Sequence, residues 1–310
     1  MTPRHIVVVG NGMVGSRFVE EAVRHDPDGE RVRITIVGNE AGRAYNRVLL
    51  PGVISGRYST DEILLPRVDG PSVRVRSGTE VTDVNRRARC VALSDGTKLS
   101  FDRLVLATGA HPRIPGVFGL RAPQGRQGSG VATLRSLVDC HRIERLVRSG
   151  TRVVVLGGGV LGLETARSLA IRGAHVSVVE AAPWVLPRQL DRSAAKILAD
   201  SYASLGIAVR CGRKAVSWQP GHGLELDDGT VVAGDVLVAA AGVRSATYLA
   251  ERAGIAVQEG IVVDDTLTTS DPRVHAIGDC AQHTEGDAGL VSPGWKQAAV
   301  LARLLSSPGC

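Results

Sequence analysis

Two stretches of the chain are nearly the same: residues 6–15 read IVVVGNGMVG and residues 153–162 read VVVLGGGVLG. Each begins as a run of β-branched residues, breaks into glycines and continues into an amphipathic pattern, which is typical of a buried strand that turns sharply into a helix. The repetition continues, because residues 94–97 (SDGT) and 227–230 (DDGT) each precede an apolar run that ends in a glycine turn. The sequence therefore predicts one α/β unit followed by a second of the same kind.

The glycines of both stretches have the spacing G-x-G-x-x-G, and each glycine meets a different physical demand. The first allows a tight turn, the second lets a pyrophosphate approach the backbone, and the third lets the helix pack against the strand. The helix N-terminus then offers unpaired N–H groups and a partial positive charge to the phosphates. The predicted phosphate-binding residues are Gly10, Gly12, Met13 and Gly15 in the first unit and Gly157, Gly159, Val160 and Gly162 in the second.

An acidic residue follows the second strand of each unit, at the place where it can bond a ribose hydroxyl. The apolar run 33–37 leads to Glu40, and the run 175–179 leads to Glu180. Each unit is therefore predicted to bind a dinucleotide. A protein that holds two dinucleotides at once has a natural use for them, which is to pass electrons from one to the other.

Composition agrees with an α/β enzyme of about two domains, at 310 residues with 44% hydrophobic and 22% charged residues. The net charge is +6, but the basic residues are scattered and aromatic residues make up only 3%, so no nucleic-acid partner is expected. Two explanations of the positive charge remain open: it attracts an acidic electron-carrier protein, or it belongs to an ordinary solvated surface. No apolar run is long enough to span a membrane, and the first one ends at Gly10, so we expect no signal peptide and a cytoplasmic location.

The motif order also predicts the domain boundaries. We expect a discontinuous first domain, residues 1–115 plus 244–310, because the second nucleotide fold, residues 116–243, is complete before the last strands begin. Residues 121–130 (RAPQGRQGSG) have no periodicity and many turn formers, which predicts a mobile loop. Residues 294–305 have the spacing of a closing helix.

The order of motifs resembles the two-dinucleotide-binding-domain flavoproteins of the pyridine nucleotide-disulfide oxidoreductase superfamily, which includes glutathione, thioredoxin, ferredoxin and rubredoxin reductases. Residues 44–50 (AYNRVLL), 11–15 (NGMVG) and 292–296 (SPGWK) are most similar to the N-terminal flavin domain of the NAD(P)H nitrite reductase large subunit. The resemblance implies an α/β fold with two Rossmann-like domains of the glutathione/thioredoxin reductase type, for FAD and then NAD(P)H. Since the chain stops after the closing helix, we expect no C-terminal interface domain and no iron–sulfur or sirohaem module.

The resemblance also implies roles for individual residues. Glu164 matches a glutamate near the nicotinamide ring, and Trp295 and Lys296 match residues near the pyrimidine edge of the flavin; these three form the predicted catalytic set. For Glu164 the structural alternative is a charge that the helix dipole favours in the first turn of a helix. For Trp295 the alternative is an aromatic residue packed in the core or at an interface. The implied FAD contacts, besides the first glycine set, are Glu40, Arg47, Val81, Ala107, Thr108, Gly109, Gly278 and Asp279, and those of the nicotinamide dinucleotide are Glu180, Ala241 and Gly242.

The acid at Glu180 bears on the choice of nicotinamide cofactor. A carboxylate accepts a hydrogen bond from a ribose hydroxyl but repels the 2′-phosphate of NADPH, which normally calls for a nearby arginine. Residues 181–184 supply no cation, so NADH is favoured, while Arg188 keeps NADPH open.

The cysteines argue against two other kinds of chemistry. Cys90, Cys140, Cys211, Cys280 and Cys310 form neither the C-x4-C nor the C-x2-C pair of disulfide reductases, so no thiol relay is expected, and Cys280 is interpreted as a packed thiol. The nearby histidines do not complete a four-ligand zinc site, so we predict no metal.

These observations predict an FAD-dependent NAD(P)H oxidoreductase that moves hydride from NADH to flavin N5 and then passes electrons to a separate acceptor. The acceptor is expected to be an iron–sulfur protein or a nitrogen-oxide or other small-molecule partner. Two alternatives remain open: an NADH oxidase or direct small-molecule oxidoreductase, and a non-catalytic redox-sensing flavoprotein. The sequence also leaves an oligomer open.

Overall fold

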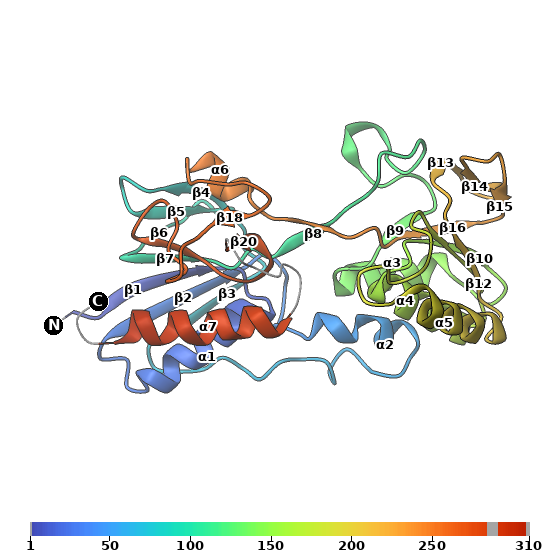
Figure 1. Ribbon diagram of the computed structural model, residues 1–310. Helices are drawn as coiled ribbons and strands as arrows, with labels where there is room; N and C mark the ends of the chain where they lie inside the picture. The colour runs from blue at the N-terminus through green and yellow to red at the C-terminus, as the bar shows by residue number, and fades with distance from the viewer. Residues whose placement is uncertain (1, 284–290, 308–310) are drawn as a thin grey trace. The chain divides into compact units, whose positions relative to one another are not determined.

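The computed structural model describes residues 2–283 and 291–307, and their contacts divide the chain into two compact units (Figure 1). The chain passes between the units in two short strands, β8 (Ala110–Pro112) and β17 (Val243–Ser245), which pair with each other. The segment Arg47–Ile63 groups with unit 2, although it falls within residues 1–115, which are predicted to belong to the first domain. Unit 1 comprises Met1–Asn46, Leu64–His111 and Arg244–Cys310, and unit 2 comprises Arg47–Ile63 and Pro112–Val243.

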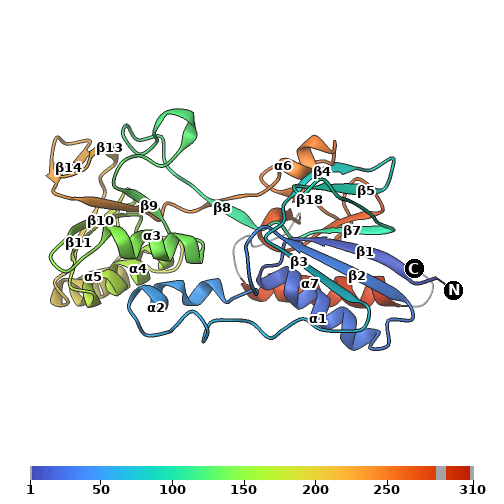
Figure 2. The same ribbon diagram turned by 180° about the vertical axis from the view of Figure 1, so that it is seen from behind.

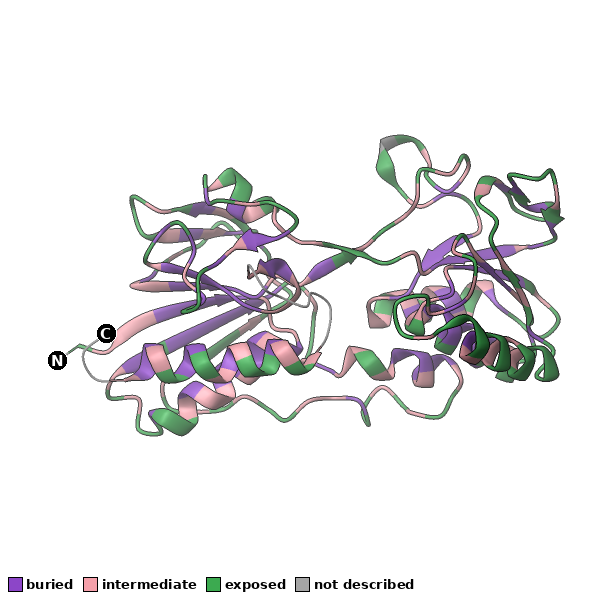
Figure 3. Cartoon of the chain, in the orientation of Figure 1, coloured by how far each residue is buried: buried purple, intermediate pink, exposed green. Residues whose placement is uncertain are grey.

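Unit 1 is built on a five-stranded parallel sheet in the order β19-β7-β1-β2-β3. Its central strand is fully buried at Ile6, Val7 and Val8, as expected for a parallel strand covered on both faces (Figure 3). The late strand β19 completes the sheet by pairing with β7. The strands are β1 (Arg4–Val9), β2 (Val32–Gly38), β3 (Val73–Ser77), β7 (Arg103–Leu106) and β19 (Val274–Ala276).

Helices α1 (Met13–His25) and α7 (Val291–Ser306) lie side by side on one face of this sheet (Figures 1 and 2). Helix α1 buries Phe18, Val19 and Ala22 against the core, while its arginines and glutamates form ion pairs on the outer face. A small antiparallel sheet lies on the opposite face and consists of β4 (Val81–Asn85), β5 (Cys90–Leu93) and β6 (Lys98–Ser100), with the short helix α6 (Tyr248–Arg252) beside β4. The remaining elements of unit 1 are the turn η3 (Gly278–Cys280) and the paired strands β18 (Ile261–Val262) and β20 (Ala281–Gln282).

Unit 2 repeats this plan with a five-stranded parallel sheet in the order β12-β11-β10-β16-β9 and an antiparallel sheet in the order β13-β14-β15. The strands are β9 (Val131–Thr133), β10 (Arg152–Leu156), β11 (His175–Glu180), β12 (Ala208–Cys211), β13 (Ala215–Gln219), β14 (Gly223–Leu226), β15 (Val231–Val232) and β16 (Val236–Ala239). The helical segments are η1 (Arg47–Leu49), α2 (Leu50–Ile54), η2 (Pro123–Gly125), α3 (Leu137–Leu146), α4 (Val160–Ile171) and α5 (Arg192–Ser204).

The two units have the same strand order when β1, β2, β3 and β7 are matched to β10, β11, β12 and β16. Each carries its three-stranded antiparallel sheet immediately before the fourth of these strands. The units differ in the origin of one edge strand, because β19 comes late in unit 1 and β9 comes early in unit 2. The prediction of two Rossmann-like α/β units is confirmed.

The segment predicted as a mobile loop, residues 121–130, contains the short turn η2, and near its end the Ser129 carbonyl accepts a hydrogen bond from the Trp218 indole at 3.1 Å. The residues just before this segment are anchored on unit 2. Leu120 is fully buried in a cluster with Trp218, and Phe118 forms a bridge to Ser217 on β13. Gly119 packs so closely on this strand that a Cβ there would lie 2.1 Å from the Trp218 carbonyl oxygen. The absence of periodicity correctly indicated irregular structure in residues 121–130, but it did not reveal the apolar anchor at Leu120 just before them; the mobility of the segment stays a prediction.

None of the helices in the described residues combines the length and apolarity that a bilayer crossing requires.

Candidate dinucleotide-binding sites

The three glycines of the first motif lie at the turn from β1 to α1, and each has a different surrounding. Gly10 has φ +115°, and a Cβ there would lie 2.1 Å from the Ala107 carbonyl oxygen. A Cβ at Gly15 would lie 1.9 Å from the Gly10 oxygen, so helix and strand are packed backbone against backbone. At Gly12 a Cβ would meet nothing within 4 Å. Gly10 and Gly15 therefore close the turn, while Gly12 borders open space where a pyrophosphate could approach.

The second motif repeats this arrangement at the turn from β10 to α4. Gly157 has φ +123° and a Cβ there would lie 2.4 Å from the Ala240 oxygen, whereas a Cβ at Gly162 would lie 2.0 Å from the Gly157 oxygen. Gly159, like its counterpart, has nothing within 4 Å of the Cβ position. In both motifs, therefore, the first and third glycines are packed too closely for a side chain, and the second borders open space.

The helices that follow leave their first amide groups available. Helix α1 begins at Met13 and α4 at Val160, and neither has a side-chain cap or an acidic residue in its first turn. The N–H groups of a helix N-terminus otherwise need a partner, and a phosphate supplies one. Both turns therefore fit the pyrophosphate of a dinucleotide.

The two predicted ribose-binding acids are oriented in different ways. The carboxylate of Glu180, at the end of β11, accepts hydrogen bonds from the amides of Gly158 at 2.6 Å and Ala182 at 2.8 Å. Glu40 follows β2, and its carboxylate accepts a hydrogen bond from the hydroxyl of the buried Tyr45 at 2.5 Å. Glu180 is thus bonded directly to its glycine turn, whereas Glu40 is held by Tyr45, which was not among the predicted site residues.

The other predicted turns in unit 1 gather at the carboxyl ends of the same strands. Ala107, Thr108 and Gly109 follow β7, and Ala107 is the residue against which Gly10 packs. Gly278 follows β19 with φ +74°, and its Cβ position lies 3.1 Å from the side chain of Val14, between the second and third glycines of the motif. Ligands of open α/β sheets bind at this edge. In unit 2 the matching turn, Ala241 and Gly242, follows β16 beside the Gly157 turn.

Three predicted residues lie outside these clusters. Arg47 is in η1, which groups with unit 2, and its guanidinium donates a hydrogen bond to the Arg135 carbonyl at 2.7 Å. Val81 begins β4, and its side chain is buried in the core of unit 1. Glu164 is exposed on α4, beyond the first turn, so the alternative that the helix dipole favours a charge there does not apply. Partial burial raises the pKa of the Glu164 carboxyl.

The remaining two members of the predicted catalytic set lie on α7. Trp295 is 40% exposed and Lys296 is exposed, so Trp295 is not a core aromatic within unit 1. Among the described residues Lys296 has no ion pair, which leaves its ammonium group available to a ligand. The roles of all the predicted site residues stay predictions.

The cysteines of the described residues are all free. Cys140 and Cys280 are buried, and burial raises the pKa of both thiols, that of Cys140 to about 12. Cys280 donates to the carbonyl oxygens of Leu106 and Ile277 at 3.3 Å each, which fits a packed thiol. Within residues 2–283 and 291–307, no group of three or more His, Cys, Asp or Glu side chains could hold a metal ion. Cys310 lies outside the described residues.

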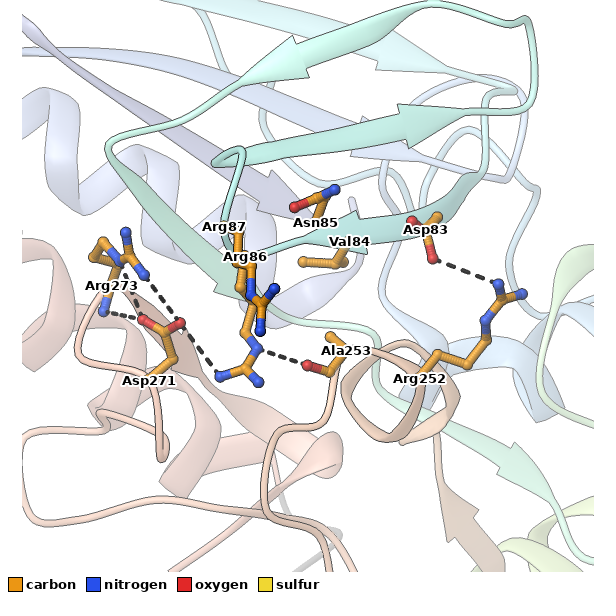
Figure 4. Close-up of a pocket in the computed structure, with 9 residues that line it drawn as sticks. All are labelled: Asp83, Val84, Asn85, Arg86, Arg87, Arg252, Ala253, Asp271 and Arg273. Atoms are coloured by element: carbon orange, nitrogen blue, oxygen red, sulfur yellow. Dashed lines mark hydrogen bonds and ion pairs between the residues drawn. The ribbon is translucent and has the colours of Figure 1, made fainter.

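A pocket of about 370 Å³ in unit 1 is distinct from the dinucleotide turns (Figure 4). Arg273 lies just before β19, so the pocket is at the opposite end of the strands from the glycine turn. The buried carboxylate of Asp271 lies between Arg86, at 3.5 Å, and Arg273, at 3.3 Å. Arg86 also donates to the Ala253 carbonyl at 2.6 Å. The charges of this pocket largely satisfy one another, and they fasten the β4–β5 turn to α6.

Comparison with known proteins defines the class to which this fold and these sites belong. Residues 4–300 match the family model described as pyridine nucleotide-disulphide oxidoreductase, and the chain belongs to this family. Members of the family are enzymes that use FAD and NAD(P)H, so the predicted class of enzyme and the predicted cofactors are confirmed at this level.

Three similar proteins narrow the comparison within this family. The chain is 36% identical to the NAD(P)H nitrite reductase large subunit of Klebsiella oxytoca, over 99% of the chain and 32% of that protein. It is 32% identical to the assimilatory nitrate reductase electron transfer subunit of Bacillus subtilis (strain 168), over 100% of the chain and 40% of that protein. A crystal structure of a covalent putidaredoxin reductase–putidaredoxin complex matches with a TM-score of 0.87 and 28% identity, covering 98% of the chain and 75% of that protein. The chain thus spans well under half the length of these two curated relatives.

Proposed function

We propose that unit 1 binds FAD, that unit 2 binds NADH, and that the protein passes electrons from NADH through the flavin to a separate acceptor. The observation that carries this proposal is the duplicated turn, in which the second glycine alone borders open space in both units. When bound, the flavin accepts hydride from the nicotinamide and releases the electrons singly or as a pair.

In this proposal the protein binds and orients the cofactors. The amides that open α1 and α4 bind the two pyrophosphates, and Glu40 and Glu180 orient a ribose in each unit. Asp279 binds the ribityl chain, and Lys296 supplies a positive charge near the pyrimidine edge of the flavin, where negative charge develops on reduction. Glu164 is proposed to lie near the nicotinamide ring, and Trp295, like Lys296, near the pyrimidine edge of the flavin.

NADH is the proposed reductant because of the way in which Glu180 is held. Two backbone amides hold its carboxylate in place, and its remaining lone pairs can accept a hydrogen bond from a ribose 2′-hydroxyl. A 2′-phosphate would meet this fixed negative charge. Arg188 is exposed and forms no ion pair within the described residues, so it does not neutralise Glu180.

The proposed acceptor is an acidic iron–sulfur protein. Two observations support it: the likeness to a putidaredoxin reductase that was crystallised with putidaredoxin, and the net charge of +6. The similarity to nitrite reductase large subunits makes a nitrogen-oxide-handling partner the related choice. The cytoplasmic location and the oligomeric state stay predictions.

Rapid mixing of the purified yellow protein with NADH tests the proposal. Fast loss of the visible flavin absorbance, followed by slow reoxidation in air and fast reoxidation by an added iron–sulfur protein, is the expected result. Fast reoxidation by oxygen alone would instead identify an NADH oxidase. A chain that binds FAD but is not bleached by NADH would contradict the proposed electron path.

A further inference from the structure

The short turn η3 presents Asp279, the residue proposed to bind the ribityl chain of FAD, and this turn is held by side chains from distant parts of unit 1. Its first residue, Gly278, has φ +74°, a conformation that L side chains rarely adopt. A three-residue turn has little internal hydrogen bonding of its own. What fixes the backbone around Asp279 must therefore come from neighbouring elements.

On one side of Asp279 the fixing group is Gln297, from the middle of α7. Its side-chain carbonyl Oε1 accepts a hydrogen bond from the Gly278 amide at 2.8 Å. Gln297 is partly buried, and the helix that carries it is anchored by Ala298 and Leu301, which are fully buried. The Gln297 oxygen that accepts this hydrogen bond is therefore carried by a firmly packed helix.

On the other side the fixing group is Ser245, in β17. Its hydroxyl donates a hydrogen bond to the Asp279 carbonyl oxygen at 2.7 Å. The next residue, Ala246, is bonded twice to the turn after β7: its carbonyl accepts from the Thr108 hydroxyl at 2.7 Å, and its amide donates to the Gly109 carbonyl at 2.9 Å. The backbone that carries Ser245 is thus fixed to another turn at the same edge of the sheet.

We propose that Gln297 and Ser245 are positioning residues that together hold Asp279 for the ribityl chain of FAD. The proposal rests on the proposed function, in which unit 1 binds FAD. One side chain fixes the amide before Asp279 and the other fixes the carbonyl after its Cα, so the direction of the Asp279 carboxylate is set from both sides. Neither residue belongs to a glycine motif, and neither needs to touch the cofactor.

The test compares FAD affinity with the stability of the FAD-free protein in the full chain. Ser245→Ala and Gln297→Met each remove one hydrogen bond and keep similar bulk. Each is expected to raise the Kd for FAD about 3- to 10-fold, the range for the loss of one hydrogen bond. Ser245→Thr retains a hydroxyl and should restore the Kd. The matched control is Ser204→Ala, which removes a hydroxyl that donates to a backbone carbonyl at the same 2.7 Å, but on α5 of unit 2.

The Kd is measured from the fluorescence of FAD as it binds, and the melting temperature is measured without FAD. A raised Kd for both variants, with a melting temperature close to that of Ser204→Ala, supports the positioning role. Unchanged Kd values, or a lowered melting temperature that Ser245→Thr does not rescue, would overturn it. If the unsubstituted chain binds no FAD, the proposed function itself fails and this inference fails with it.

Discussion

The amide of Gly158 donates a 2.6 Å hydrogen bond to the carboxylate of Glu180, which ties the middle of the second glycine turn to the end of the neighbouring strand. The same carboxylate accepts from Ala182, so both of its oxygens are engaged by the backbone. This arrangement fixes the carboxylate in place before any ligand arrives. It makes the choice between NADH and NADPH a property of the resting protein.

Replacing Glu180 with alanine should therefore weaken the use of NADH more than that of NADPH. Loss of a hydrogen bond to a charged group costs about 1.5–3 kcal/mol, so the KM for NADH should rise about 10- to 100-fold. The ratio of kcat/KM for the two reductants measures the effect. Glu225→Ala, at an exposed glutamate that accepts from the Ser217 hydroxyl, is the control. An unchanged ratio would contradict the role given to Glu180.

The glycines of the first motif should separate stability from cofactor binding. Gly10→Ala forces a Cβ to within 2.1 Å of a backbone oxygen at positive φ, so it should lower the free energy of unfolding by about 2 kcal/mol or more. Gly12→Ala meets no protein atom, so the FAD-free chain should unfold at the same urea concentration as the unsubstituted chain while FAD binding is lost. Retention of full FAD affinity in Gly12→Ala would show that no pyrophosphate approaches there.

The thiols should react with iodoacetamide in an order set by burial. Cys140 and Cys280 are buried with raised pKa values, so almost no thiolate is exposed at pH 8 in the folded chain. Cys90 and Cys211 are only partly buried and should be alkylated first. Peptide mass spectrometry over time gives the order, with urea-unfolded protein as the reference in which all sites react. Early alkylation of Cys280 would overturn its interpretation as a packed thiol.

Asp271 should make unit 1 sensitive to acid. Burial opposes its ionisation, but hydrogen bonds from Arg273 and the charges of Arg273 and Arg86 prevail and lower the pKa of its carboxyl. Its contribution to stability is therefore complete above the unfolded value of about 3.9 and is lost as pH falls through the lower folded value.

Asp271→Asn should accordingly reduce the free energy of urea unfolding by about 1–3 kcal/mol at pH 7, and the difference should shrink towards pH 3. The control is Asp69→Asn, because Asp69 and its partner Arg67 are both largely exposed. A difference that is the same at both pH values would show that the charge of Asp271 is not what stabilises the unit.

The parts of the fold that the sequence predicted are those encoded by local sterics. The spacing of Gly10, Gly12 and Gly15 indicates a strand, a turn and a helix because backbone atoms leave no room for a Cβ at two of the three positions. The position of Glu180 is predicted by the same motif, because the acid follows the second strand of the unit. The motif itself indicates the distant contact that these features include, the packing of Gly10 against the Ala107 carbonyl oxygen.

The contacts that the sequence did not predict join residues far apart in the chain. Nothing near Gln297 indicates that its amide oxygen meets Gly278, and the hydroxyl of Ser245 meets Asp279 across 34 positions. The irregular segment after residue 112 is fixed by Leu120, whose burial depends on Trp218 in another strand. Similarly, Arg47–Ile63 joins unit 2 through contacts such as that of Arg172 with the Ile54 carbonyl at 2.9 Å.

The different origins of the two edge strands have a consequence for synthesis on the ribosome. All five strands of the unit 2 sheet have been translated once residue 239 is made, whereas the sheet of unit 1 still lacks β19, residues 274–276. The nascent chain must therefore carry an unfinished first sheet while the second closes. The turn that bears Asp279 emerges later still, so the half proposed to capture flavin is the last to become competent.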